Sequence, residues 1–176
     1  ADNVAPSLYG GLVVSTYQNE KWEYVKLPVE EVELVAVIPE FEAKTKDSRG
    51  LLPDRLSFSE AVTGSSHANV MLGAFMLKKW DLVGKMMESD IFHEPYRQKL
   101  FPNFQQLKER AGEAGAFGVT ISGAGPTVIC FCEKGKGRKV VSTLSSEFSQ
   151  HKVELLQVSK AGSEVHSNHL CKVSSI

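Results

Sequence analysis

The segment Ser122–Thr127, SGAGPT, has the residue types of an anion-binding loop. Gly123 and Gly125 allow the backbone to adopt a positive φ and to come close to a ligand. Successive backbone N–H groups in such a turn form a concavity that suits anionic oxygens. Because no Lys-Ser or Lys-Thr pair follows and a strand is predicted next, the segment is neither a P-loop nor a dinucleotide-binding fingerprint. A tight hairpin turn without a ligand is the alternative, and the segment alone does not decide between the two.

Arg49 and Arg97 are the candidates for holding a carboxylate or a phosphate. Each ends a stretch with local turn chemistry, TKDSR at 45–49 and HEPYR at 93–97. The planar guanidinium matches the two oxygens of a carboxylate or phosphate with two parallel hydrogen bonds. A solvated surface charge is the alternative interpretation for either arginine on its own.

Metal and thiol chemistry have less support in the sequence. His166, His169 and Cys171 have loose metal-ligand spacing, but no second ligand pair accompanies them, and no metal site is predicted. Cys130 and Cys132 stand two residues apart, so a strand would place both thiols on one buried face. Three cysteines do not predict a disulfide framework, which favours a reducing compartment.

The composition is that of an ordinary globular chain. Twenty Lys and Arg face 21 Asp and Glu, which gives a net charge of −1, and 42% of the 176 residues are hydrophobic. This balance excludes a strongly basic nucleic-acid-binding protein and offers no polybasic patch to a membrane surface. The longest uncharged stretch, residues 114–132, contains several glycines and a proline. It therefore predicts two strands and a turn rather than a membrane helix.

Hydrophobic periodicity predicts the elements that must position these residues. A continuous apolar strand is expected at 34–38, and SFSE at 57–60 matches a capping box that opens a helix to residue 79. The other expected elements are helices at 82–87, 104–114 and 140–148 and strands at 117–122, 127–132 and 153–158. This order is the split β-α-β-β-α-β pattern of an α+β, ferredoxin-like domain with extra helices in its first crossover.

Four segments together resemble the homoserine kinases, a branch of the GHMP superfamily of small-molecule kinases. They are ADNVAPS with YGG at 1–11, TKDSR with LLP at 45–53, EPYR at 94–97 and ISGAGPT at 121–127, in matching order and spacing. The last is similar to the third motif of the superfamily, and the first three are typical of the homoserine branch. The resemblance extends from residue 1 to about residue 158.

The resemblance implies that the protein transfers the γ-phosphoryl group of ATP to the side-chain hydroxyl of L-homoserine, a cytoplasmic step toward threonine. It implies that Arg49 and Arg97 hold the substrate carboxylate. Asp2 and Asn3 would lie near the substrate hydroxyl or amino group, with Asp2 the candidate catalytic residue. The other residues implied to border the substrate and the phosphates are Gly123, Ala124 and Gly125. ATP and Mg²⁺ are the implied cofactors, a homodimer is compatible with the resemblance, and neither nucleic acid nor a membrane is an expected partner.

The chain departs from the family in one large respect. Family members carry a glycine-rich loop of the Pro-x-x-x-Gly-Leu-Gly-Ser-Ser-Ala type that cradles the ATP phosphates near Ser and Glu ligands of Mg²⁺, and no segment here matches it. We therefore expect this chain, which starts at Ala1 rather than Met, to be the C-terminal part of a kinase and to be inactive alone. Residues 1–30 would finish the N-terminal domain, residues 31–160 would form the C-terminal domain, and residues 161–176 would be a polar tail.

Two alternatives stay open at this point. Another GHMP kinase, acting on a mevalonate-type or sugar substrate, would not need two arginines for an amino-acid carboxylate. A stand-alone ferredoxin-like module that binds an amino acid would need only the loop at 123–126. Substrate profiling tests the first alternative, and a ligand titration without nucleotide tests the second.

Overall fold

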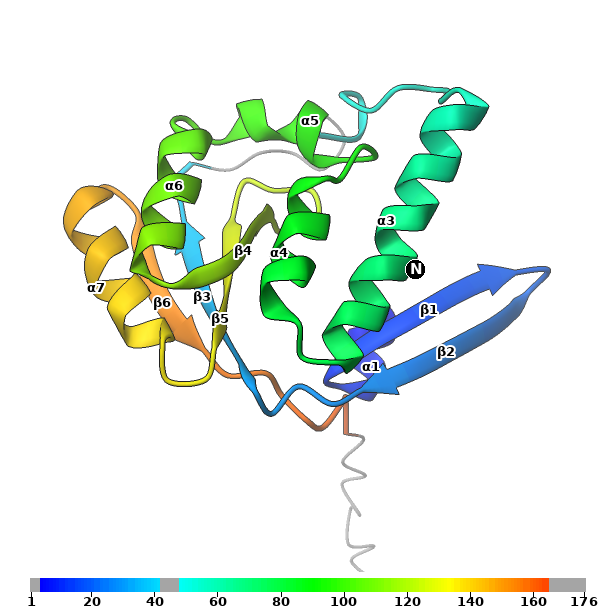
Figure 1. Ribbon diagram of the computed structural model, residues 1–176, viewed down its shortest axis with the longest axis horizontal. Helices are drawn as coiled ribbons and strands as arrows, with labels where there is room; N and C mark the ends of the chain where they lie inside the picture. The colour runs from blue at the N-terminus through cyan, green and yellow to red at the C-terminus, as the bar shows by residue number, and fades with distance from the viewer. Residues whose placement is uncertain (1–3, 42–47, 165–176) are drawn as a thin grey trace, which may run out of the picture. The chain divides into compact units, whose positions relative to one another are not determined.

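The computed structural model describes residues 4–41 and 48–164 (Figure 1). These residues form two compact units. The first comprises residues 4–28 with 159–164, and the second comprises the described residues between Val29 and Val158.

The first unit is built on a β-hairpin. α1 (Val4–Tyr9) leads into β1 (Leu12–Gln18), which pairs with the antiparallel β2 (Lys21–Leu27). Asn19 and Glu20 connect the strands with φ angles of 51° and 60°. A two-residue hairpin turn needs this left-handed conformation to match the twist of its strands. Asn19 and Glu20 thus form the two-residue turn of this hairpin.

The end of the chain's last strand leads back to this first unit. The backbone N–H of Gly11 donates to the carbonyl of Ser159 at 2.7 Å. The ammonium of Lys26 donates to the carbonyls of Tyr9 at 2.8 Å and Lys160 at 2.7 Å. Residues 159 and 160 therefore pack with the hairpin unit. The assignment of this unit to an N-terminal kinase domain stays a prediction.

The second unit is an α+β domain with a four-stranded antiparallel sheet. The strands are β3 (Val32–Ile38), β4 (Ala116–Ile121), β5 (Val128–Glu133) and β6 (Lys152–Leu156). The sheet order is β4-β5-β3-β6, which confirms the predicted split β-α-β-β-α-β arrangement. The helices are α3 (Phe58–Met76), α4 (Trp80–Glu88), α5 (Glu94–Arg97), α6 (Phe104–Ala114) and α7 (Gly137–Glu147), with a 3₁₀ turn at Gln98–Leu100.

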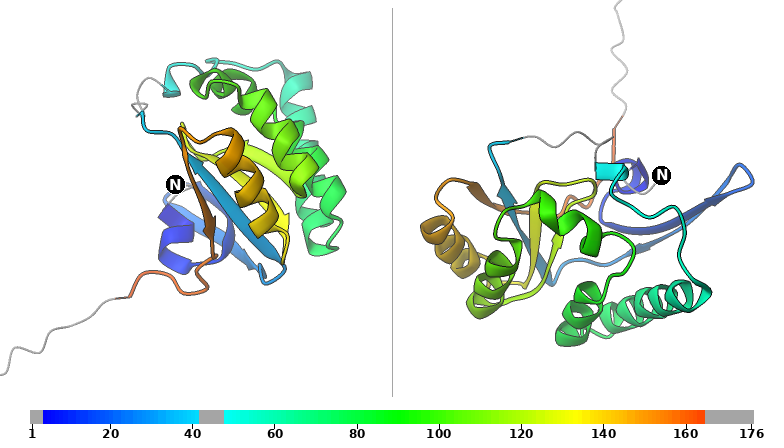
Figure 2. Two further views of the ribbon diagram at one scale, coloured as in Figure 1. Left: turned by 90° about the vertical axis from the view of Figure 1, so that its left-hand side faces the viewer. Right: turned by 90° about the horizontal axis from the view of Figure 1, so that it is seen from above.

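The core lies between the sheet and the two helices α6 and α7, which run side by side over one face of it (Figure 2, left). Alternate residues of β5 enter this core, where Val128, Cys130 and Cys132 are fully buried. Leu107 of α6 and Leu144 of α7 are buried in the same cluster. The two thiols are buried on one face, as predicted, and burial raises the pKa of Cys132 to about 12.

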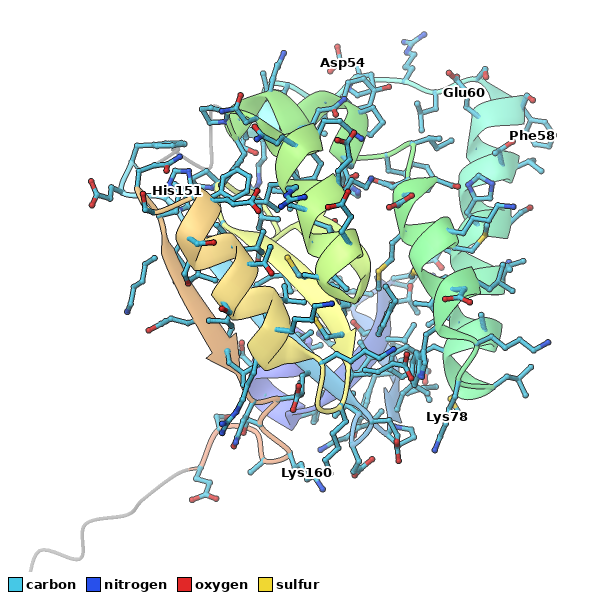
Figure 3. The ribbon with its side chains drawn as sticks, turned by 60° about the vertical axis from the view of Figure 1, so that its left-hand side comes forward. Asp54, Phe58, Glu60, Lys78, His151 and Lys160 are labelled. Atoms are coloured by element: carbon cyan, nitrogen blue, oxygen red, sulfur yellow. The ribbon has the colours of Figure 1, made fainter. Side chains whose placement is uncertain are left out.

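α3 begins with the predicted capping box. Ser57 Oγ accepts the Glu60 N–H at 3.2 Å, and the Glu60 carboxylate accepts the Ser57 N–H at 2.7 Å. The Ser57 hydroxyl also donates to the Glu60 carboxylate at 2.6 Å, and this bond, with that from the Ser57 N–H, lowers the pKa of Glu60, whose side chain stands at the start of the helix (Figure 3). A Cβ added to Gly64 would lie 2.4 Å from the Phe92 ring, so this glycine permits close packing. Gly73 of the same helix has open space around an added Cβ, so close packing does not account for a glycine there.

Candidate active site

The segment predicted to bind anions is the turn between β4 and β5. The N–H of Ser122 donates to the Thr127 carbonyl at 2.8 Å, and the N–H of Gly125 donates to the Ser122 carbonyl at 2.8 Å. Gly123 and Gly125 have φ angles of 53° and 79°, the left-handed region that glycine adopts readily, and the bond from Gly125 to Pro126 is cis. The segment is thus a tight hairpin turn with the backbone conformation expected of a ligand-bordering loop.

The short helix α5 carries Arg97 to this turn. The Asp90 carboxylate accepts the N–H groups of Phe92 and His93, both at 2.9 Å, and of Glu94 at 2.7 Å, and so satisfies free donors at the helix start. Arg97 is the last residue of α5, and its Nη1 donates to the Gly123 carbonyl at 2.7 Å. Two predicted site residues, 26 positions apart in the chain, are therefore in direct contact.

The Arg97 guanidinium has donor capacity left for a ligand. Its Nε is buried and has no hydrogen-bond partner among the described residues. A buried donor without a partner costs free energy, so such an atom in a native protein calls for a specific explanation. A carboxylate or phosphate oxygen is the partner that a guanidinium fork matches in geometry and charge.

Ser48 attaches the segment that carries Arg49 to the same turn. The Ser48 hydroxyl donates to the Ala124 carbonyl at 2.6 Å, and the residue is fully buried. Arg49 follows directly and is exposed, in a turn closed by the N–H of Leu51 on the Ser48 carbonyl. Both predicted arginines therefore belong to segments hydrogen-bonded to residues 123–124. The sequence analysis missed Ser48, although it stands inside the TKDSR motif.

A buried ion pair joins α5 to α6. The Lys108 ammonium of α6 donates to Glu94 Oε1 at 3.1 Å, and both side chains are largely buried, 14% and 9% exposed. Desolvation raises the pKa of Glu94, and Lys108 opposes that shift only in part while Asp90 adds to it. The sequence analysis gave Glu94 no role of its own, although it stands inside the EPYR motif, and nothing in the sequence pattern marked Lys108.

Replacing Glu94 by glutamine is expected to change how stability depends on pH. Because the folded-state pKa is raised above its ordinary value of 4.5, the folded protein holds this proton to higher pH than the unfolded chain does. The stabilisation that this bound proton provides is complete below the pKa that Glu94 has in the unfolded chain. It is lost as the pH rises through the pKa that Glu94 has in the folded protein. Glu94→Gln should therefore gain stability relative to the wild type between about pH 4 and about pH 7. Urea denaturation at both pH values measures this, and an equal stability difference at the two pH values would contradict it.

The remaining predicted site residues and site types can be placed only in part. Asp2, Asn3, His166, His169 and Cys171 lie outside the described residues. Within residues 4–41 and 48–164, no group of three or more His, Cys, Asp or Glu side chains is arranged to hold a metal ion. No helix in these same ranges is long and apolar enough to cross a membrane.

Comparison with known protein families gives a match in this second unit. Residues 71–150 match the family model described as GHMP kinases C terminal. The chain is 42% identical over 161 residues to the homoserine kinase of Bacillus licheniformis, covering 92% of this chain and 53% of that protein. It is 49% identical over 144 residues to the homoserine kinase of Carboxydothermus hydrogenoformans, covering 81% of this chain and 47% of that protein. The chain thus spans about half the length of the curated relatives it matches.

Solved structures agree with these sequence relatives. The crystal structure of homoserine kinase from Cytophaga hutchinsonii matches with a TM-score of 0.82 at 32% identity, over 92% of this chain and 53% of that one. The crystal structure of L. major mevalonate kinase in complex with R-mevalonate matches with a TM-score of 0.68 at 15% identity, over 89% of this chain and 51% of that one. The second likeness shows a shared fold and nothing finer.

Proposed function

The chain carries the C-terminal domain of a GHMP kinase, and on this premise we propose that the protein phosphorylates the side-chain hydroxyl of L-homoserine with ATP. The observation that carries the proposal is the contact between Arg97 and the turn at residues 122–127. Its Nη1 is bound to the Gly123 carbonyl, and its buried Nε has no partner among the described residues. Such a guanidinium is oriented to receive the carboxylate of an amino-acid substrate.

Arg49 is proposed as the second ligand of that carboxylate. Its segment is held to the Ala124 carbonyl by Ser48, so the two arginines approach one turn from different parts of the chain. Two guanidinium groups would discriminate strongly against a substrate that has no carboxylate, because such a substrate would lose the charge-assisted hydrogen bonds to both arginines.

The proposed reaction needs the substrate hydroxyl in line with the γ-phosphorus of ATP. The hydroxyl oxygen forms a bond to phosphorus, the bond to the bridging oxygen breaks, and ADP leaves with that oxygen. Phosphoryl transfer depends mainly on positioning and on neutralising charge, with little covalent chemistry for the protein. Arg97, Arg49 and the turn would supply the positioning of the acceptor. Asp2 remains the candidate for receiving the hydroxyl proton, and Asn3 remains a candidate contact of the substrate.

ATP and Mg²⁺ are proposed from the family and not assigned to residues of this chain. The phosphate-cradling loop expected of the family has no counterpart in the 176 residues. The described residues also offer no cluster that suits a metal ion. A cytoplasmic location and a homodimer likewise stay predictions.

The proposal predicts ATP-dependent phosphorylation of L-homoserine by the complete protein that contains this chain. The same assay with 3-aminopropan-1-ol, which lacks the carboxylate, should give kcat/KM lower by on the order of 100-fold or more, because the charge-assisted hydrogen bonds to the arginines would be lost. Coupled measurement of ADP release gives both values. Equal turnover of the two alcohols, or preferred turnover of mevalonate or a sugar, would contradict the proposal.

The 176-residue chain alone is the control for this assay. We expect it to give no turnover, because it has no recognisable loop for the ATP phosphates. Joining it to the part of the Bacillus licheniformis homoserine kinase that it does not match should restore turnover. Homoserine binding by the chain without nucleotide, combined with no turnover in any form, would instead favour an amino-acid-binding module.

A further inference from the structure

Glu94 stands among the three elements that surround the candidate site. It is the first residue of α5, it pairs with Lys108 of α6 at 3.1 Å, and α5 itself packs against β4. β4 leads directly into the turn that holds Gly123. One carboxylate thus ties the helix that carries Arg97 to α6, beside the strand that leads to the residue Arg97 touches.

Stability alone does not explain a carboxylate at this position. Burial disfavours its charged form, and its Oε2 is buried with no hydrogen-bond partner among the described residues. Lys108 has a second carboxylate within reach, since Glu88 lies 3.8 Å away and is 52% exposed. Buried ion pairs are often no better for stability than apolar packing of the same volume. A role in the geometry of the site is therefore the more direct explanation.

The short helix needs outside support to hold Arg97 in place. α5 has only four residues, far fewer than a helix needs to be stable on its own. Glu94 and Arg97 are three residues apart, so their side chains leave the helix on the same face. Asp90 holds the start of the helix through three backbone N–H groups, but none of these bonds reaches the sheet. Glu94 makes the side-chain bond from α5 to α6, a helix that packs on the sheet through Leu107 and Ala111.

We propose that Glu94 is a positioning residue, which fixes α5 against α6 so that the Arg97 guanidinium meets both the Gly123 carbonyl and the substrate carboxylate. The inference rests on the proposed function for its substrate and on the fold for its geometry. Arg97 touches the substrate in this scheme, and Glu94 acts through Arg97.

The test compares two glutamine variants in the complete protein that contains this chain. Glu94→Gln removes the buried charge at nearly constant volume, and Glu88→Gln removes the exposed carboxylate near the same lysine. Glu94→Gln should raise KM for L-homoserine by on the order of tenfold to 100-fold, the cost of a small misplacement of a binding group, and leave KM for ATP unchanged. Glu88→Gln should change neither constant. Equal behaviour of the two variants would overturn the proposal.

A double variant separates positioning from a general loss of structure. In an Arg97→Ala background, Glu94→Gln should add little to KM for L-homoserine, because the group it positions is already absent. If Glu94→Gln raised KM by the same factor with and without Arg97, the proposal would be overturned. Lys108→Gln removes the charge of the Glu94 partner but keeps a hydrogen-bond donor there, and it should raise the same KM to a smaller extent. This milder variant keeps the test informative if Glu94→Gln folds poorly.

A crystal structure of the Glu94→Gln variant tests the positioning role without depending on which substrate the protein uses. Loss of the bond between Arg97 Nη1 and the Gly123 carbonyl would support the positioning role, and retention of the 2.7 Å contact would overturn it. If the wild type does not phosphorylate L-homoserine at all, the proposed function fails, while the positioning of Arg97 is still decided by this structure.

Discussion

Replacing Arg97 by alanine is expected to lower kcat/KM for L-homoserine by roughly 30-fold to 4,000-fold. Loss of one partner from a desolvated, hydrogen-bonded charge pair costs on the order of 2–5 kcal/mol, and each 1.4 kcal/mol is about a factor of ten. The Nη1 bond to Gly123 orients the guanidinium, and the buried Nε has no other partner among the described residues. Steady-state kinetics of the complete protein that contains this chain, with ATP saturating, measure the loss.

Three companion variants make this result specific. Arg97→Lys keeps the charge but removes the planar fork, so it should recover only part of the loss. Arg49→Ala should show a similar defect if the second arginine also holds the carboxylate. Arg138 is exposed on the first turn of α7, and Arg138→Ala should leave the kinetics unchanged. Wild-type kcat/KM in both Arg49→Ala and Arg97→Ala would show that the carboxylate assignment is wrong.

Gly84→Ala is expected to destabilise the second unit by about 3 kcal/mol, the upper range for an overpacked contact. A Cβ at this position would lie 1.5 Å from the Phe117 carbonyl oxygen and 2.7 Å from its carbon. Both are backbone atoms of the edge strand β4, so no flexible side chain can move aside. Gly118 faces Gly84 across the same contact, where an added Cβ would lie 3.5 Å from the Gly84 Cα. Urea denaturation measures the loss in the free energy of unfolding. The dependence of that free energy on urea concentration should match the wild type, so that the two values can be compared.

Two other helix glycines provide matched controls with the opposite sign. Neither Gly73 of α3 nor Gly112 of α6 has an atom within 4 Å of an added Cβ. Alanine at either position should stabilise the protein by about 0.5–1 kcal/mol, because it restricts the unfolded chain and favours the helix. If Gly84→Ala were as stable as these variants, the close approach of α4 to β4 would have to be wrong.

Local sequence patterns were sufficient to predict most helices and strands of the second unit. The run at 34–38, the capping box at 57–60 and the alternation through residues 128–133 each depend on neighbours within a few positions. Packing density, in contrast, is not a local property. Gly64 and Gly73 have the same residue type in the same helix, yet only Gly64 meets another side chain closely. Asn103 stands at the expected start of α6, but its φ is 60° and its side chain makes no capping bond.

The sequence by itself determined the family, the element order and the turn at residues 122–127, because glycine conformation and motif spacing are encoded in short stretches. The tertiary structure decided which distant residues meet there. Ser48 reaches Ala124 across 76 positions, and Arg97 reaches Gly123 across 26. The pairing of Glu94 with Lys108 likewise does not follow from sequence spacing, because it forms only where α5 packs on α6. Burial then strengthens the interaction between the carboxylate and the ammonium.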